Sequence, residues 1–100
     1  MTEDVESIFL NEKPVKILVT LRRNRQDLYG SKIAKKVDTT YAHCVKTIST
    51  LEEKGYITRR EEGRKQIVEL TDKGEEAADL FGKIIDTTSD WRSALAVQAA

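Results

Sequence analysis

The order of apolar periodicities between Leu28 and Asp72 constrains the fold of this chain more than any other feature. Apolar residues recur at helical spacing in a short segment that starts near Ser31, and again in a longer segment that follows Thr40. Ser31 and Thr40 each suit an N-cap, because a hydroxyl accepts a hydrogen bond from a backbone N–H one turn into the helix. Gly55 suits the end of the longer segment, since glycine tolerates the left-handed backbone found there. The pattern predicts two helices joined by a tight turn.

Two segments that resemble β-strands come next, Tyr56–Arg60 and Lys65–Leu70. Residues 61–64 between them contain Gly63 and fit the tip of a hairpin. Helix, turn, helix and hairpin in this order make a winged helix-turn-helix, a domain that usually puts its second helix into the DNA major groove. The sequence therefore predicts a mainly α fold with a small β-hairpin wing.

The segment before this motif predicts a core helix. Asn11 is a suitable N-cap, and Pro14 fits only the first turn of a helix. Five of the seven residues 15–21 are apolar, as expected for a helix surrounded by the rest of the domain.

The segment after the motif predicts two further helices. Thr71 is expected to cap a fourth helix with an apolar face over residues 77–85. Residues 86–90, with the sequence Asp-Thr-Thr-Ser-Asp, interrupt this pattern. Trp91–Gln98 is expected to form a last short helix.

Charge is distributed unevenly along the chain, although its total is zero. The segment from Lys13 to Lys65 contains 14 basic and 6 acidic residues, a net charge of +8, which the remainder balances. The basic segment coincides with the helix-turn-helix. This coincidence favours a nucleic-acid-binding face on an otherwise acidic body.

Composition argues against several other classes. A chain of 100 residues with 39% hydrophobic content can bury one modest core. The acidic N-terminus does not resemble a signal peptide, and no apolar run approaches the roughly 18 residues of a membrane span. A soluble cytoplasmic protein is expected.

Catalytic and metal chemistry find no support in the sequence. The single Cys44 stands beside the single His43, but two such ligands cannot complete a tetrahedral metal site in one protomer. Cys44 falls on an apolar stripe, where a free cysteine usually packs as a small hydrophobe. The chain lacks a phosphate-binding glycine loop and a nucleophile with a suitably spaced base. We therefore expect neither an enzyme nor a cofactor.

The second helix of the motif supplies the predicted DNA-reading face. Its buried stripe is Cys44, Ile48 and Leu51, so the opposite side should meet solvent. On that side Lys46 can reach a guanine or a phosphate, and Ala42 can meet a thymine methyl. The predicted contact residues of this helix and its cap are Thr40, Tyr41, Ala42, His43, Val45, Lys46 and Ser49.

The wing and the preceding helix add further candidates. Arg64 and Lys65 at the wing tip suit phosphates or a narrow minor groove, and Arg59 lies on the strand before them. Ser31 and Lys32, at the start of the preceding helix, are expected to hold a phosphate.

Two motifs carry a family resemblance. Leu51–Gly55 reads Leu-Glu-Glu-Lys-Gly, and Leu70–Gly74 reads Leu-Thr-Asp-Lys-Gly after the wing. At this spacing the chain, over about residues 14–74, resembles the MarR-like and PadR-like winged-helix transcriptional regulators, with most likeness to short archaeal or viral members. The wing lacks the Asp-x-Arg arrangement common in MarR proteins. A small-molecule effector is compatible with the resemblance but not indicated by the sequence.

The resemblance implies a sequence-specific regulator of transcription that binds double-stranded DNA, more often a repressor. Residues 1–74 would form the DNA-binding domain and residues 75–100 a C-terminal dimerisation segment of the same compact unit. An apolar helix face needs a partner, so a homodimer that reads a pseudo-palindromic operator is expected. Val5, Ile8 and Phe9 are expected to assist the dimer. The predicted interface residues are Leu80, Phe81, Ile84, Trp91 and Leu95.

Two alternatives remain open from the sequence. A winged helix can serve as a protein–protein module in a transcription-related assembly, and a neutral or acidic recognition face would be its mark. A weakly specific architectural DNA-binding protein would instead carry a strongly basic total charge.

Overall fold

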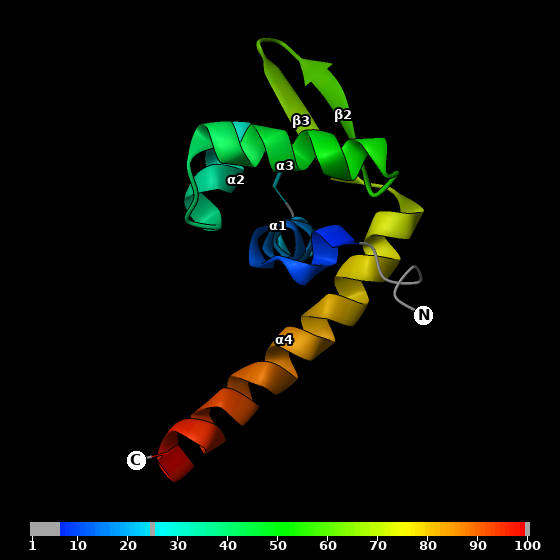
Figure 1. Cartoon of the computed structure of the whole chain (residues 1–100). Helices are drawn as coiled ribbons and strands as arrows, with labels where there is room; N and C mark the ends of the chain where they lie inside the picture. The colour runs from blue at the N-terminus through cyan, green and yellow to red at the C-terminus, as the bar shows by residue number, and fades with distance from the viewer. Residues whose placement is uncertain (1–6, 25, 100) are drawn as a thin grey trace.

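The structure is a computed structural model that describes the backbone of residues 7–24 and 26–99 and the side chains of residues 7–24 and 26–86. The last two strands, β2 (Ile57–Glu62) and β3 (Lys65–Leu70), project from the helices as a hairpin, and the C-terminal half of the last helix, α4 (Asp72–Ala99), extends away from the other elements (Figure 1). The predicted mainly α winged-helix fold is confirmed. The elements in chain order are the 3₁₀ helix η2 (Ser7–Leu10), α1 (Glu12–Arg23), β1 (Leu28–Tyr29), α2 (Gly30–Lys36), α3 (Tyr41–Glu53), β2 (Ile57–Glu62), β3 (Lys65–Leu70) and α4 (Asp72–Ala99).

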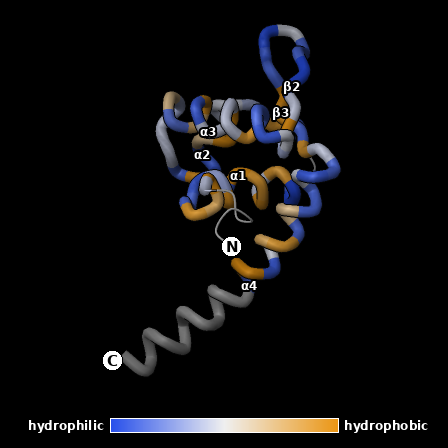
Figure 2. The backbone as a smooth tube through the Cα atoms, turned by 45° about the vertical axis from the view of Figure 1, so that its right-hand side comes forward, coloured by the Kyte–Doolittle hydropathy of each residue, from blue (hydrophilic) through white to orange (hydrophobic). Residues whose placement is uncertain are grey.

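The core lies where α1 meets α2, α3 and the base of the sheet. Ile17 and Leu18 of α1 are fully buried, as are Cys44 and Leu51 of α3. Figure 2 shows hydrophobic residues along α1 and at the base of the hairpin, and mostly hydrophilic residues around the hairpin tip. The predicted roles of α1 as the core helix and of the α3 stripe are confirmed.

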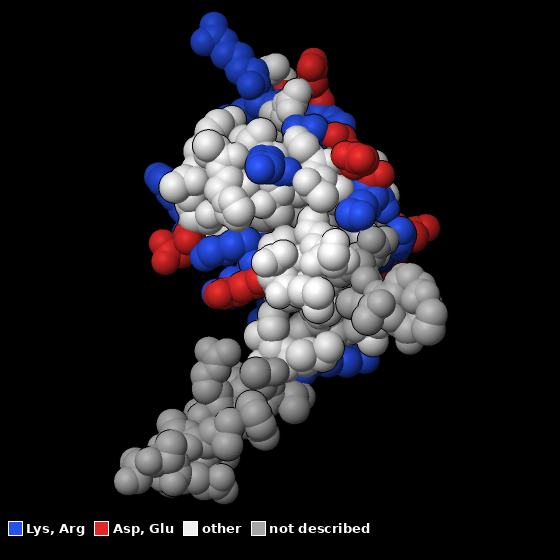
Figure 3. Space-filling model, viewed as in Figure 1, with Lys and Arg blue, Asp and Glu red and all other residues white. Residues whose placement is uncertain are grey.

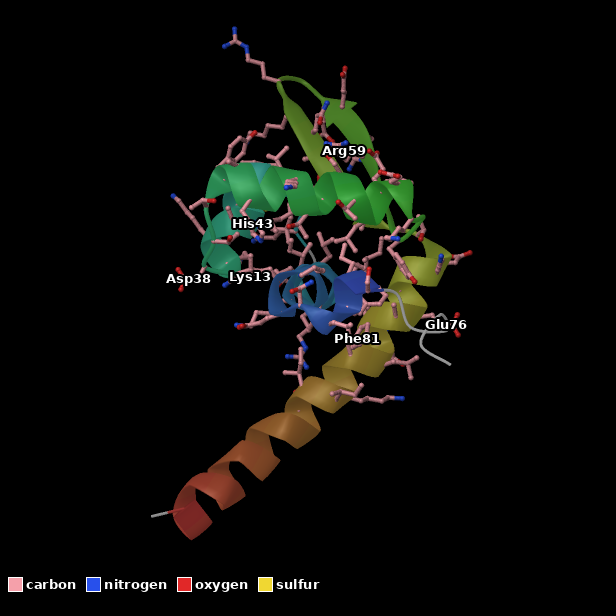
Figure 4. All side chains as sticks on the ribbon, in the orientation of Figure 1. Lys13, Asp38, His43, Arg59, Glu76 and Phe81 are labelled. Carbon is pink, nitrogen blue, oxygen red and sulfur yellow. The ribbon has the colours of Figure 1, made fainter. Side chains whose placement is uncertain are left out.

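The turn between α2 and α3 is fixed by polar contacts. The Thr40 hydroxyl accepts a hydrogen bond from the His43 N–H at 3.2 Å, as predicted for the N-cap. Asp38 adopts a left-handed conformation with φ of 56°. The Lys13 ammonium of α1 donates to the carbonyls of Val37 and Asp38, each at 2.9 Å, and Figure 4 shows Lys13 beside Asp38.

The prediction that Ser31 caps α2 is wrong. The helix begins at Gly30, with Tyr29 as its N-cap and no side-chain cap hydrogen bond. The reason is β1, which pairs Tyr29 with Ile67 and so fixes the chain in a strand until the residue before Gly30.

Glycine ends α3 as predicted. Gly55 has a φ of 87°, and its N–H donates to the Glu52 carbonyl while the Tyr56 N–H donates to the Leu51 carbonyl. This pair of bonds is a Schellman motif, which satisfies carbonyls that the helix leaves without partners. It also turns the chain directly into β2.

The sheet has three antiparallel strands in the order β1-β3-β2. The predicted strand Tyr56–Arg60 is shifted, since β2 runs from Ile57 to Glu62 and pairs Glu62 with Lys65. The hairpin tip is therefore shorter than the predicted residues 61–64, and Gly63 supplies its left-handed residue with a φ of 64°. Sequence periodicity missed β1 altogether.

The predicted break in the last helix is wrong. A single helix, α4, runs through residues 86–90 and through the segment predicted as a separate short helix. Asp, Thr and Ser are weak helix formers, but the stretch contains neither Gly nor Pro, so the helix is not forced to end. Thr71 caps α4 as predicted, because its hydroxyl accepts from the Gly74 N–H at 3.0 Å. No helix of the described residues is long and apolar enough to cross a membrane.

Candidate nucleic-acid interface

A groove of about 460 Å³ separates the wing from α3 and the start of α2. Tyr41 and Val45 come from α3, and Arg64 and Lys65 come from the wing tip. Gly30 lines the groove next to Tyr41, and a Cβ at Gly30 would lie 3.1 Å from the Tyr41 ring. The groove is lined by Tyr29, Gly30, Ser31, Tyr41, Val45, Ile48, Arg59, Arg64, Lys65, Gln66 and Val68.

Six of the predicted contact residues meet in this groove, although they come from four elements. Their meeting follows from the fold, since the wing stands beside α3 and over the start of α2 (Figure 1). Tyr41 is 61% exposed, so its ring is open to a ligand. These six residues are Ser31, Tyr41, Val45, Arg59, Arg64 and Lys65.

The other predicted residues of α3 do not line the groove. Ala42, Lys46 and Ser49 are exposed on the outer side of the helix. His43 is exposed too, but it lies on the side of α3 away from the wing (Figure 4). The Thr40 hydroxyl is engaged as the N-cap. The structure thus separates the predicted set into a groove-lining part, an outward part and His43.

Arg59 enters the groove already bound to a carboxylate. Its Nη2 and Nε donate to Oε1 of Glu52, at 2.6 Å and 3.2 Å. The hydrogen bond lowers the pKa of Glu52 and raises that of Arg59, because each stabilises the charged form of the other. The positive charge of Arg59 is therefore compensated within the protein.

Arg60, the next residue, points to the opposite face of the sheet, as strand alternation requires. Its guanidinium binds the carboxylates of Glu62, Glu69 and Asp27, the last two at 3.0 Å and 3.4 Å. The two arginines near the end of the basic segment are thus both paired with carboxylates, and less of that segment's positive charge faces outward than its composition suggests.

Charge is sorted by position on the face that contains α3. Figure 3 shows a largely uncharged surface over α3, with Lys or Arg at the tip of the wing and at the margins. Asp and Glu gather along the flank of the wing away from α2. A ligand in the groove would meet an aromatic and apolar floor with cations at its wing edge.

Lys32 lies beside a second hollow of about 370 Å³ on the other side of the wing base. It shares this hollow with Arg64 and Lys65, which also line the groove. Tyr29 lies between the two hollows and lines both. The predicted pairing of Ser31 and Lys32 at one site is therefore divided between neighbouring hollows.

Sequence reasoning missed Tyr29 and Gln66 as groove residues. Tyr29 belongs to a strand of two residues, which is too short for a periodic pattern. Gln66 follows the basic Lys65 on β3. Both side chains are exposed, so the strand shows no alternation that would single out Gln66. The only usable signal was an aromatic residue directly before Gly30.

Cys44 has the surroundings of a packing residue. It is fully buried, its Sγ donates to the Gly30 carbonyl at 3.5 Å, and burial raises the pKa of its thiol. A raised pKa lowers the thiolate fraction and hence reactivity. Among the described residues, no three His, Cys, Asp or Glu side chains lie close enough to hold a metal ion.

A separate apolar surface lies on α4 and η2. Leu10, Leu80 and Ile84 are 78%, 55% and 55% exposed. The sequence placed Phe81 on this surface, yet its ring packs within the chain, 4.9 Å from that of Phe9. Trp91 and Leu95 lie outside the residues whose side chains are described, as does Val5.

The chain has relatives in archaea. A family model described as the DUF6293 C-terminal winged helix domain matches residues 24–82. A protein of Archaeoglobus fulgidus described as uncharacterized is 32% identical over 89 residues, which cover 86% of this chain and 94% of that protein. The crystal structure of AF1382 from the same organism is 34% identical, with a TM-score of 0.73, and covers 83% of this chain and 97% of its own.

The fold also matches that of a bacterial regulator. The Staphylococcus aureus MepR–DNA complex contains a chain 22% identical to this one, with a TM-score of 0.70, and the match covers 97% of this chain and 82% of that chain. At that identity the likeness shows the fold alone, a winged helix, as the sequence predicted. The family match covers more than half of the chain and includes α2, α3 and the wing. The chain therefore belongs to the family of the DUF6293 C-terminal winged helix domain.

Proposed function

We propose that this protein is a cytoplasmic transcriptional regulator that binds double-stranded DNA sequence-specifically. We propose further that it acts as a repressor. The observation that carries the proposal is the groove itself, which brings an exposed helix face and a basic wing onto one side of the molecule. The shared fold with MepR, a protein whose structure contains DNA, supports the same reading.

Recognition would rest on the outer side of α3. Inserted in a major groove, Lys46 would approach guanine or phosphate, and Ser49 could donate or accept at a base edge. Ala42 adds a small apolar contact for a thymine methyl. These three side chains are exposed and lie clear of the core, so a base could reach them without rearrangement.

The wing would supply the backbone contacts. Arg64 and Lys65 follow the turn residue Gly63, and both line the groove. A cation on the wing, across the groove from α3, suits a phosphate or the adjacent minor groove. Since Arg59 and Arg60 are held by carboxylates, Arg64 and Lys65 carry the charge that the wing presents.

A homodimer is the second part of the proposal. Leu80 and Ile84 are one helical turn apart on α4, and both are largely exposed. Burial of a Leu or Ile side chain contributes about 1.5–3 kcal/mol, and a two-fold interface counts each residue twice. Residues 75–100 would then join two domains of residues 1–74 so that they read a pseudo-palindromic operator.

Selection of binding sites from random duplex DNA tests the DNA-binding proposal. We expect a recovered consensus, with affinity for the selected duplex on the order of 1,000-fold or more above that for a scrambled duplex. Arg64→Ala should reduce the slope of log affinity against log salt concentration by about one. Recovery of no consensus would refute sequence-specific binding.

Sedimentation of the full chain tests the dimer. The wild type should be a dimer at tens of micromolar, whereas Leu80→Glu combined with Ile84→Glu should be a monomer with intact helical circular dichroism. Glu76→Gln with Asp79→Asn, two exposed substitutions on the same helix, is the matched control and should stay dimeric. A wild-type monomer at that concentration, with and without DNA, would refute the dimer.

A further inference from the structure

One aromatic ring at the base of the wing contacts two ammonium groups from different elements. The Nζ of Lys65, the first residue of β3, lies 4.5 Å from the centroid of the Tyr29 ring. The Nζ of Lys32, from α2, lies 5.8 Å from the same centroid. Cations within about 6 Å of a ring centroid are attracted by the negative face of the ring. Tyr29 thus connects the helix-turn-helix with the wing through its side chain.

The backbone holds this ring in place. Leu28, the residue before Tyr29, is almost fully buried, and β1 pairs Leu28 with Val68 and Tyr29 with Ile67. Gly30 begins α2 immediately afterwards. The ring is half-buried and separates the two hollows beside the wing. Its position is therefore set by the core and the sheet, unlike that of the flexible lysines it contacts.

The nearby carboxylates are otherwise engaged. Asp27 and Glu62 line the second hollow together with Lys32 and Lys65. Each of these two carboxylates forms an ion pair with the guanidinium of Arg60. The Tyr29 ring contacts both ammonium groups, and two like charges gathered at one ring suit a polyanion.

We propose that Tyr29 is a positioning residue for DNA-backbone binding, which holds the ammonium groups of Lys32 and Lys65 together as a phosphate-binding pair between α2 and the wing. The inference rests on the proposed DNA-binding function. A free lysine loses considerable side-chain entropy when it binds a phosphate, and a ring that already restrains it reduces that loss. The ring also fixes the distance between a contact from α2 and one from the wing.

Two substitutions at Tyr29 separate the ring from the hydroxyl. Affinity is measured from about 50 to 200 mM salt on the selected duplex and on a random duplex of equal length. Tyr29→Leu should bind both duplexes more weakly, about two- to five-fold for each lysine released, with a shallower salt slope. Tyr29→Phe keeps the ring and should stay within about two-fold of the wild type. If Tyr29→Phe loses as much as Tyr29→Leu, the hydroxyl acts and the proposed role is wrong.

A double-mutant cycle ties the effect to the lysines. In a Lys65→Met background the loss caused by Tyr29→Leu should shrink, because one of the two restrained cations is already gone. Equal losses in both backgrounds would overturn the inference. Lys73→Met is the matched control, since the Lys73 ammonium lies 4.3 Å from the Tyr56 ring but lines neither hollow, and it should leave the salt slope unchanged.

The same measurements distinguish this inference from the proposed function. A wild type that prefers the selected duplex, together with a Tyr29→Leu variant of equal stability, affinity and slope, would refute the positioning role alone. A wild type without any preference for the selected duplex would refute the proposed function. Thermal unfolding of each variant shows that the compared proteins are folded.

Discussion

The base of the wing and the groove beside the wing are built in different ways. At its base, the chain passes from α3 into β2 and from β3 into α4 through backbone contacts. The Thr71 hydroxyl donates to the Gly55 carbonyl at 2.6 Å, and the Thr71 N–H donates to the Tyr56 carbonyl at 3.1 Å. Gly74 is buried directly against that carbonyl. In this junction, formed by Gly55, Tyr56, Thr71 and Gly74, the backbone of Tyr56 leaves no room for a side chain at Gly74.

At the groove, by contrast, long side chains meet across open space. Tyr41, Arg64 and Lys65 are exposed, so these three side chains can be replaced without opening the core. The difference indicates that the junction sets the position of the wing, whereas in the proposed function the groove and the outer side of α3 contact DNA. Substitutions in the junction should therefore alter stability, and substitutions of the exposed groove side chains should alter binding alone.

The largest effect is expected for Gly74→Ala. A Cβ at this position would overlap the Tyr56 carbonyl oxygen, which is backbone and cannot move aside. We expect a loss of about 3 kcal/mol or more in the free energy of unfolding, although alanine is the better helix former. Urea unfolding followed by circular dichroism measures it.

Gly82→Ala, on the same helix, is the matched control for this prediction. A Cβ there would meet Arg23 Nη2 at an ordinary 3.6 Å. We expect no loss, and a gain of up to about 1 kcal/mol from helix propensity. Equal destabilisation by both substitutions would mean that the junction is not specially tight.

The second effect concerns binding. Tyr41→Ala in the groove should reduce affinity for the selected duplex by about 1–3 kcal/mol if its ring or hydroxyl contacts a base. Its melting temperature should match that of the wild type, because the side chain is exposed. Lys16→Ala, an exposed substitution on α1, is the control and should change neither quantity. A Tyr41 variant that unfolds more easily would contradict the division between groove and junction.

A smaller effect is expected at Asp38, in the turn before α3. A left-handed conformation is strained for residues other than glycine, so Asp38→Gly should stabilise the fold by up to about 1 kcal/mol. The greater freedom of glycine in the unfolded chain reduces this gain. The Lys13 contacts go to backbone carbonyls and survive the substitution. A clear loss of stability in thermal unfolding would show that the Asp38 carboxylate has a role of its own.

The smallest effect is the pH dependence of the Glu52–Arg59 pair. The folded state lowers the pKa of Glu52, so its contribution to stability is present above the unfolded pKa of about 4.5 and is lost as the pH falls through the folded value. Between about pH 5 and pH 3 the wild type should lose slightly more stability than Glu52→Gln. Glu61→Gln, an exposed carboxylate on β2, should follow the wild type. Parallel curves for all three proteins would contradict the assignment.

Local signals made much of the fold predictable from the sequence. Thr40 and Thr71 cap their helices, and Gly55 ends α3, because each acts on backbone groups within a few residues. Cys44 and Ile48 belong to a stripe long enough to show its period. Such features depend on neighbours along the chain, and a sequence displays those directly.

Features that depend on distant residues were missed. β1 has two residues and exists because β3 lies beside it, so it has no pattern of its own. The groove residue Tyr29 follows from that pairing. The carboxylate that holds Arg59 comes from the preceding helix, and composition alone counted Arg59 as a free cation. The continuity of α4 was missed because residues 86–90 are weak helix formers, which suggested that the helix ends there. The stretch contains no glycine or proline that would force it to end.

Parallel selections from random DNA with the wild type and with Lys46→Ala test the central claim most directly. Lys46 is exposed on the outer side of α3, outside both the core and the junction. If α3 reads bases, the variant should fold normally and recover a consensus that has lost its preference at one or two positions. An identical consensus with undiminished preference, from a folded variant, would contradict recognition through Lys46 on α3.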